Sequence, residues 1–420
     1  MTSKERVLAA INHKQPDRVP IDIGASNTTG ISASALYRLR DYLGLPRMDI
    51  DIYEFMQMLG RVDDDVRLAL GGDVVGLQDT TDPMGVPLDG EMQTFIMPDG
   101  TPTRIHKLHQ YDKRADGSVV FYPQGNRKAK PSAIMPDGGY FFDGIDRAEP
   151  FDEDRLTPLE DFKDAFPLYK EDALRHYEKE AKRLNNVTEC AVMGIFNKGG
   201  IGDPSTLPGT DELQPKGIRN FQDWSMAQIL YPEYITAVFE MQTEAVINNL
   251  EMYHQAVGDQ IQIIVISGTD FGTQNAPMIS REMFQSLYKP FYKRMNDWVH
   301  VHTNWKTFYH CCGSIIDLLD DFVEMGVDIL NPVQLTAKGM DAKKLKEKYG
   351  EKLVFWGGGV DTQHVLPNGT PEEITRQVWD NLDILAPGGG YVFNTIHNIL
   401  GDVPPQKIVA AFDAAKQWRY

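Results

Sequence analysis

The chain is poor in cysteine, with only Cys190, Cys311 and Cys312 among its 420 residues. Because two of these are adjacent, they cannot supply the disulfide framework of a small secreted protein, and a reducing cytoplasmic location is expected. Long hydrophobic runs are missing as well. No stretch of about 18 apolar residues occurs, and no apolar segment follows the first residues, so neither a membrane span nor a signal peptide is expected.

Positive charge is also scarce. The 42 lysines and arginines are outnumbered by 60 aspartates and glutamates, which gives a formal charge of −18. Such a surface repels phosphate backbones and anionic membranes, so neither nucleic acid nor membrane is an expected partner. The composition is otherwise that of a soluble globular protein, and the length fits one large α/β barrel or two to three smaller domains.

The chain does contain a regular series of short apolar strands, each followed by a helix or a longer excursion. Eight such strands are predicted, at residues 19–24, 73–77, 191–196, 261–266, 305–308, 327–330, 353–356 and 391–394. Eight βα units in one chain of this size predict an α/β fold, namely a closed (β/α)₈ TIM barrel. A doubly wound open sheet is the structural alternative.

The region between the second and third strands has a different pattern. From about residue 80 to 150, Gly, Pro and Asp separate short alternating runs such as 92–97 and 118–122, which predicts β-hairpins. We therefore expect a barrel formed by residues 1–79 and 151–420. Residues 80–150 are expected to be a β-rich insertion after the second strand, acting as a lid or docking element.

Among the helices, the first is expected to be capped by Ser3, and residues 33–44 and 50–70 are predicted to be helical.

Chemistry in such a barrel belongs just past the carboxyl ends of the strands. Acidic and imidazole side chains at these positions are the candidate catalytic groups, Asp79, Asp270 and His397. Mostly polar neighbours are the candidate substrate-binding residues, Asn27, Asn197, Gln334, Trp356 and Asn394. Asn and Asp also cap helices, and that alternative covers about half of the polar positions at these strand ends.

The densest group of metal-ligand residue types is His310-Cys311-Cys312, where a predicted strand ends and a helix begins. If the backbone stays extended, His310 and Cys312 share a face and Cys311 points the other way. Imidazole with thiolate suits Zn²⁺. A lone pair of this kind is also common as a packing feature, so the spacing alone leaves both interpretations open.

Several short motifs together resemble those of the uroporphyrinogen decarboxylase superfamily. They are residues 16–22 (PDRVPID), 277–280 (PMIS), 310–313 (HCCG), 331–334 (NPVQ), 357–361 (GGGVD) and 386–390 (APGGG). The resemblance runs from about residue 3 to 415, interrupted by 80–150. It implies a (β/α)₈ barrel and a homodimer. The superfamily contains cofactor-free porphyrinogen decarboxylases and zinc-dependent methyltransferases that work with a corrinoid protein.

The decarboxylase branch is disfavoured by a missing motif. Its members carry Arg-x-x-Gly-Arg just after the first strand to bind substrate carboxylates, whereas residues 24–30 here read GASNTTG and hold no arginine. The aspartate that this branch places beyond the second strand is retained, as Asp79.

The methyltransferase branch uses His-x-Cys, which His310 and Cys312 match, together with a distant cysteine in an Ala-Pro-Gly-Cys context. Gly389 stands at that place here, so another residue must complete the site, or zinc is lost.

The third ligand stays open. We rank His397 first, then Asp270, then Cys311, whereas Cys190 begins its strand and lies at the wrong end of the barrel.

The resemblance thus implies a methyltransferase of anaerobic one-carbon metabolism that takes a methyl group from a methyl ether, with a methoxylated aromatic compound as the leading candidate. Zinc, or an acid such as Asp270, is expected to stabilise the leaving oxygen. The methyl acceptor is a corrinoid carried by a separate protein, because no cobalamin signature such as Asp-x-His-x-x-Gly is present. Two alternatives are a metal-free carboxy-lyase acting on a small acid and a non-catalytic or metal-storing barrel.

Overall fold

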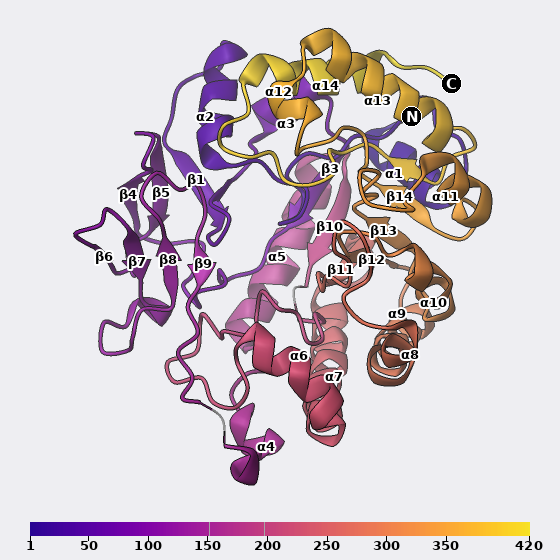
Figure 1. The fold of residues 1–420 in the computed structure, drawn as a ribbon. Coiled ribbons are helices and arrows are strands. Elements are labelled where there is room, and N and C mark those ends of the chain that lie inside the picture. The colour runs from indigo at the N-terminus through magenta and orange to yellow at the C-terminus, as the bar shows by residue number, and fades with distance from the viewer. Residues whose placement is uncertain (151, 197) are drawn as a thin grey trace.

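The computed structural model describes residues 1–150, 152–196 and 198–420. At the centre of this part of the chain is a curled sheet of seven parallel strands in the order β15-β14-β13-β12-β11-β10-β3 (Figure 1). The strands are β3 (Val74–Leu77), β10 (Ala191–Ile195), β11 (Ile263–Ser267), β12 (Lys306–His310), β13 (Ile329–Asn331), β14 (Val354–Trp356) and β15 (Tyr391–Val392). Each lies at a predicted strand, and the fold is an α/β architecture consistent with a TIM-like barrel.

The segment predicted as the first strand bridges the two ends of this sheet. Ile21 forms a parallel bridge with Phe393, just after β15. The Asp22 N–H donates to the Phe393 carbonyl at 2.9 Å, and the Asp73 N–H, just before β3, donates to the Ile21 carbonyl at 2.7 Å. Backbone hydrogen bonds therefore connect both edges of the curled sheet, at β15 and at β3, to the segment around Ile21.

The concave side of the sheet is filled by one layer of apolar side chains, most of them aliphatic and two aromatic. Its members on the central strands are Val74, Ala191, Met193, Ile195, Ile263, Val265, Phe308, Ile329, Val354, Trp356 and Val392. Helix α1 (Ser3–Ile11) packs against the same layer near the amino ends of the strands. Because alternate strand residues face one side, the layer continues in phase to His310, Asn331 and Asn394 at the carboxyl ends.

Helices cover the outer face of the sheet (Figure 1). In chain order the helices are α1, α2 (Ala33–Tyr42), α3 (Asp64–Leu70), α4 (Pro158–Asp161), α5 (Glu171–Val187), α6 (Phe221–Leu230), α7 (Pro232–Val257), α8 (Arg281–Met283), α9 (Lys289–His302), α10 (Leu319–Glu324), α11 (Ala342–Tyr349), α12 (Val365–Asn368), α13 (Pro371–Leu385) and α14 (Pro405–Gln417). Within the described ranges, none of these helices is long and apolar enough to span a membrane.

Two sequence predictions about the first third of the chain are wrong. Thr2, not Ser3, caps α1, because its side chain and that of Glu5 form a reciprocal capping box. Residues 50–70 are not one helix: β1 (Ile50–Glu54) and β2 (Leu59–Gly60) precede α3. The turn between these strands is fixed by the Glu54 carboxylate, which accepts the N–H groups two and three residues further on.

The predicted hairpins are present as antiparallel pairs. Their strands are β4 (Met92–Ile96), β5 (Pro102–His106), β6 (Tyr111–Lys113), β7 (Val119–Phe121), β8 (Ala133–Met135) and β9 (Asp143–Gly144). Together with β1 and β2 they form two four-stranded sheets beside the central sheet, in the orders β2-β1-β5-β4 and β6-β7-β8-β9 (Figure 1). Because β1 pairs with β5, the hairpin region includes residues from before position 80.

Candidate metal centre

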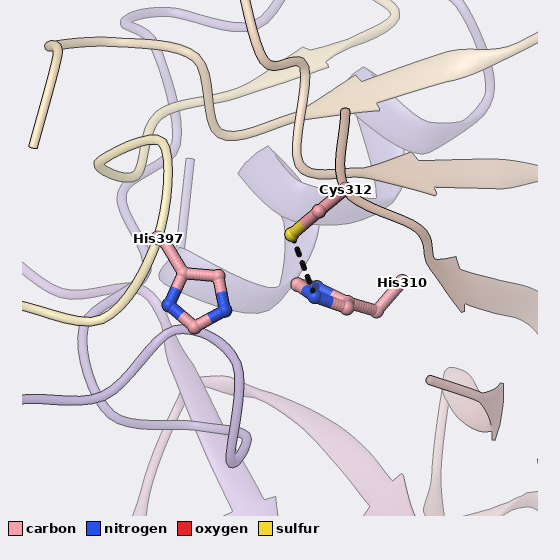
Figure 2. A group of neighbouring side chains, drawn as sticks. All are labelled: His310, Cys312 and His397. Carbon is pink, nitrogen blue, oxygen red and sulfur yellow. Dashed lines mark hydrogen bonds between the residues drawn. The ribbon is translucent and has the colours of Figure 1, made fainter. Parts of the chain in front are cut away.

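Two imidazoles and one thiol meet at the carboxyl end of the central sheet. His310 is the last residue of β12, Cys312 follows it, and His397 lies in the loop after β15. One ligand atom from each of the three lies within 4.8 Å of the others. Figure 2 shows the three side chains converging on a common space. The Cys312 Sγ is 3.2 Å from the His310 Nε2, as expected if the two residues share a face.

The orientation of the His310 ring is fixed from behind by Asn331. The Asn331 Nδ2 donates to the Trp356 carbonyl at 3.0 Å, which directs its Oδ1 toward the His310 Nδ1 at 2.7 Å. Since the amide oxygen can only accept, the His310 Nδ1 carries the proton and Nε2 presents a lone pair toward Cys312. This is the arrangement by which proteins hold an imidazole ready to bind a metal ion.

The protonation of the other two groups follows from burial. Burial, together with the neighbouring His310, lowers the pKa of His397 to about 3, so its ring is neutral at physiological pH. Burial also raises the pKa of the Cys312 thiol well above its usual range, and the nearby Asp270 carboxylate adds to this. A bound metal cation lowers the pKa of the thiol instead, because the cation binds the deprotonated thiolate.

The spacing of the three groups fits a metal ion. Zinc bonds of about 2.0–2.3 Å in tetrahedral geometry place neighbouring ligand atoms about 3.3–3.8 Å apart. The Sγ–Nε2 distance of 3.2 Å is near that range. All three ligand atoms lie within 4.8 Å of one another, so they would have to move only slightly closer together to bind one ion. Two imidazoles and a thiolate are also ligands that zinc prefers.

The two other candidate ligands, Asp270 and Cys311, lie near His310 and Cys312 but on different sides of the strand end. The Asp270 Oδ1 accepts the Cys312 N–H and is 3.8 Å from the His310 Nε2, with a side chain 42% exposed. Cys311 is buried on the opposite side of the strand, where its Sγ accepts the Phe271 N–H at 3.2 Å. Asp270 thus borders the centre, whereas the Cys311 thiol belongs to the outer core.

Gly389, which stands where the resemblance implies a third cysteine ligand, lies at the other end of the strand. Gly389 precedes β15, whereas His397 follows it. It has a φ of +82°, and a Cβ there would lie 2.5 Å from the Lys14 carbonyl oxygen. A side chain at position 389 would therefore clash at the amino end and point nowhere near His310.

A cavity of about 690 Å³ opens beside Cys312 and His397, two of the three candidate ligands. Its walls come from several strand-end loops, and the residues are Gly272, Thr273, Gln274, Cys312, Gly313, Gln334, Thr362, Gln363, Pro367, Ile396, His397, Asn398, Leu400 and Asp402. The predicted substrate contact Gln334 is among them. Its Oε1 accepts the Gly313 N–H at 2.7 Å, and its Nε2 donates to the Gln274 side chain at 3.1 Å. A small organic molecule in this cavity would lie next to Cys312 and His397.

Two predicted substrate-binding residues are fully buried beneath this site. The Trp356 indole N–H donates to the Asp22 Oδ2 at 3.0 Å, and the Asn394 Nδ2 donates to the Asp22 carbonyl at 2.8 Å. Their direct partners are therefore protein atoms. Asn197, the third of these predicted contacts, lies outside the described residues.

The remaining predicted residues are hydrogen-bonded at the rim. The Asp79 Oδ1 accepts the Tyr177 hydroxyl of α5 at 2.5 Å and the Thr80 N–H at 2.7 Å. The Asn27 carbonyl accepts the Asn398 Nδ2 at 2.9 Å. Asp79 thus joins the end of β3 to a helix, and Asn27 joins the loop after the first predicted strand to the His397 loop.

Asn398 is a structural residue of the site that sequence reasoning missed. Its Oδ1 accepts the Gly30 N–H at 2.6 Å, and its Nδ2 donates to the Asn27 carbonyl and, at 2.7 Å, to the Gln57 Oε1. It therefore ties the residue next to His397 to the beginning of the chain. The only signal for it was its adjacency to a histidine at a strand end.

Comparison with known proteins supports the resemblance seen in the sequence. The family model described as uroporphyrinogen decarboxylase (URO-D) matches residues 199–418, a segment that contains His310, Cys312 and His397. The uroporphyrinogen decarboxylases of Prochlorococcus marinus strains NATL1A and NATL2A are each 22% identical over 285 residues, which is 67% of this chain and 74% of theirs.

Among solved structures, a methyltransferase from Methanosarcina mazei aligns over 99% of both chains, with a TM-score of 0.55 at 17% sequence identity. This is a likeness of fold. The family match covers more than half of the 420 residues. The chain therefore belongs to the uroporphyrinogen decarboxylase family.

Proposed function

We propose that the protein is a methyltransferase that moves a methyl group from a methyl ether to the corrinoid of a separate protein, as the first step of O-demethylation. A methoxylated aromatic compound is the proposed donor, and zinc is the proposed metal. The observation that carries this proposal is the convergence of His310, Cys312 and His397 beside a cavity of about 690 Å³. The methyltransferase from Methanosarcina mazei, which shares the fold, supports it.

The proposed architecture is a (β/α)₈ barrel of residues 1–79 and 151–420, with the hairpins of 80–150 as a lid or as the docking surface for the corrinoid protein. A homodimer is proposed by analogy with the family.

The proposed roles follow from the contacts. His310, Cys312 and His397 would hold zinc, which supplies a Lewis acid for the leaving oxygen. Asp270 borders the ligands and is 42% exposed, so it is the proposed group that exchanges a proton with that oxygen. The carbon–oxygen bond breaks with its electron pair remaining on oxygen, and the methyl group passes to the reduced corrinoid.

The rest of the site orients the donor. Gln334 lines the cavity and can hydrogen-bond to a substituent on the donor. Trp356 and Asn394 support the floor of the site through Asp22, and we propose that Asn27 and Asp79 order the loops at its rim. Holding the donor in one orientation beside the metal ligands lowers the entropic cost of methyl transfer.

The first test is metal analysis of the purified protein beside a His310→Ala, Cys312→Ala double variant. We expect about one zinc per chain, lost in the double variant. Cys190→Ala is the matched control, because this cysteine precedes β10 at the opposite end of the sheet and should not affect zinc content. The second test is methyl transfer from methoxylated aromatics to a Co(I) corrinoid protein. Native protein without zinc, or zinc retained by the double variant, would contradict the proposed centre.

A metal-free carboxy-lyase acting on a small acid is the second candidate. The two Prochlorococcus relatives, which are uroporphyrinogen decarboxylases, favour it. The absence of arginine from residues 24–30 argues against a substrate with many carboxylates. Release of CO₂ from small acids by zinc-free protein, without methyl transfer from any ether, would establish this alternative instead.

A further inference from the structure

We propose that the cavity beside His397 selects methyl donors that are neutral or positively charged, and that Asp402 at its rim is a residue that determines this selectivity. The inference rests on the proposed function, because it names the charge class of the donor for the same site.

The lining carries hydrogen-bonding groups but no fixed positive charge. Among the described residues that form the cavity wall there is no lysine or arginine. Besides Cys312, His397 and Asp402, the polar side chains are four amides and two hydroxyls, Gln274, Gln334, Gln363, Asn398, Thr273 and Thr362. Amides and hydroxyls can bind phenol, hydroxyl and ether groups. A carboxylate on the donor would lose hydration there without gaining a cationic partner, which disfavours its binding.

The ammonium group of Lys407, in α14, does not line the cavity. Its Nζ donates to the carbonyl of the lining residue Pro367 at 2.6 Å, so this charge is already held by a backbone oxygen.

Among the groups that line the cavity, counted together with Asp270, negative charge is in excess. A divalent cation held by the Cys312 thiolate and two neutral imidazoles keeps one positive charge. The Asp270 carboxylate, 3.8 Å from the His310 Nε2, offsets it. Asp402 then remains uncompensated, because it is exposed and forms no salt bridge within the described parts of the chain. An anionic donor would meet this charge on entry, whereas a cationic one would be attracted.

The test is the binding of three methoxylated rings of equal size that differ in one substituent. The probes are para-methoxybenzylamine, para-methoxybenzyl alcohol and para-methoxybenzoate, titrated calorimetrically into zinc-loaded and zinc-free protein at low ionic strength. We expect the amine to bind at least about threefold more tightly than the benzoate, with the alcohol between them, and the difference to shrink as salt is added. This readout needs no catalytic activity.

The variant Asp402→Asn assigns the effect to one side chain. It should reduce the amine-to-benzoate affinity ratio by about threefold or more. Asp297→Asn is the matched control: it removes one negative charge from α9, where Asp297 is 54% exposed and paired with Lys293, and it should leave the ratio unchanged.

The outcomes separate this inference from the proposed function. Tightest binding by the benzoate, an unchanged ratio in Asp402→Asn, an equal change in both variants, or no binding of any ring would overturn the inference. The expected affinity order without methyl transfer to a corrinoid protein would leave the inference standing and remove the proposed function.

Discussion

The two ends of the central sheet differ in how their polar side chains are used. At the amino end, the Asp73 carboxylate is fully buried and accepts hydrogen bonds from the Ser3 hydroxyl, the Arg6 and Arg18 guanidinium groups and the Ile21 N–H. At the carboxyl end, His310, Cys312 and His397 converge on a shared space. The amino end thus holds the strands together, whereas the carboxyl end keeps its polar atoms available for a ligand.

The amino end is expected to dominate stability. Replacing Asp73 by Asn leaves the Arg18 guanidinium without its carboxylate and leaves Arg6, which is only 8% exposed, with Asp17 as its one remaining carboxylate partner. We expect a loss of about 3–5 kcal/mol in the free energy of unfolding, measured by urea denaturation, with zinc content per folded chain unchanged. Asp41→Asn is the control. Asp41 is 54% exposed and pairs with Arg47, so its loss should cost at most about 0.5 kcal/mol. Equal losses of stability in both variants would show that the buried Asp73 network does not dominate the stability of the protein.

The carboxyl end is expected to control metal binding instead. Cys312→Ala should weaken zinc binding by at least about 100-fold, which corresponds to about 3 kcal/mol, and should barely change the stability of the zinc-free protein. Cys311→Ala should give the reverse, because this side chain is buried in the outer core. Competition with a chromogenic chelator measures the affinity, and loss of zinc from the Cys311 variant would reverse the assignment.

The stability of the protein should also depend on pH, through a buried carboxyl group at the end of β1. Burial raises the pKa of Glu54 from an ordinary 4.5 to about 7. A carboxyl with a raised folded-state pKa makes the protein less stable as pH rises from about 4.5 to about 7. Glu54→Gln removes this penalty, so the variant should gain up to about 3 kcal/mol relative to the native protein over that window. Urea denaturation at pH 5 and pH 8 checks it, and a stability difference that is the same at both values would contradict it.

The smallest expected effect separates positioning from ligation. Asn398→Ala removes the side chain that ties the His397 loop to Gly30 and Gln57, so zinc affinity should fall about tenfold. The control is Asn249→Ala. Asn249 is 1% exposed and anchors Tyr169 and Pro167 in the same way, away from the metal ligands. If the two variants lose stability equally and both retain native zinc affinity, Asn398 has no positioning role.

Patterns within short stretches of sequence predicted the strands of the central sheet and the direction of side chains along them. Apolar runs located every strand of the central sheet, and the period of two along β12 predicted that His310 and Cys312 share a face. The region 50–70 failed because Ile50–Glu54 pairs with β5, a strand about 50 residues further on, which no local pattern contains.

The third ligand could be ranked but not determined. The path of the His397 loop depends on Asn398 and Gly30, which are 368 residues apart in the sequence. The family motif pointed to Gly389, yet that position precedes β15 and so lies at the other end of the strand. Sequence spacing alone does not show at which end of a two-residue strand a motif will lie.

The hydrogen bond from Gly30 to Asn398 has a consequence for the order in which the protein matures. His310 and Cys312 leave the ribosome well before His397, and the loop that carries His397 is held by residues from the beginning of the chain. A nascent or truncated chain that ends before residue 397 contains two of the three candidate ligands and lacks the third. The proposed three-residue metal centre can therefore form only after residue 397 has been synthesised and its loop has met Gly30.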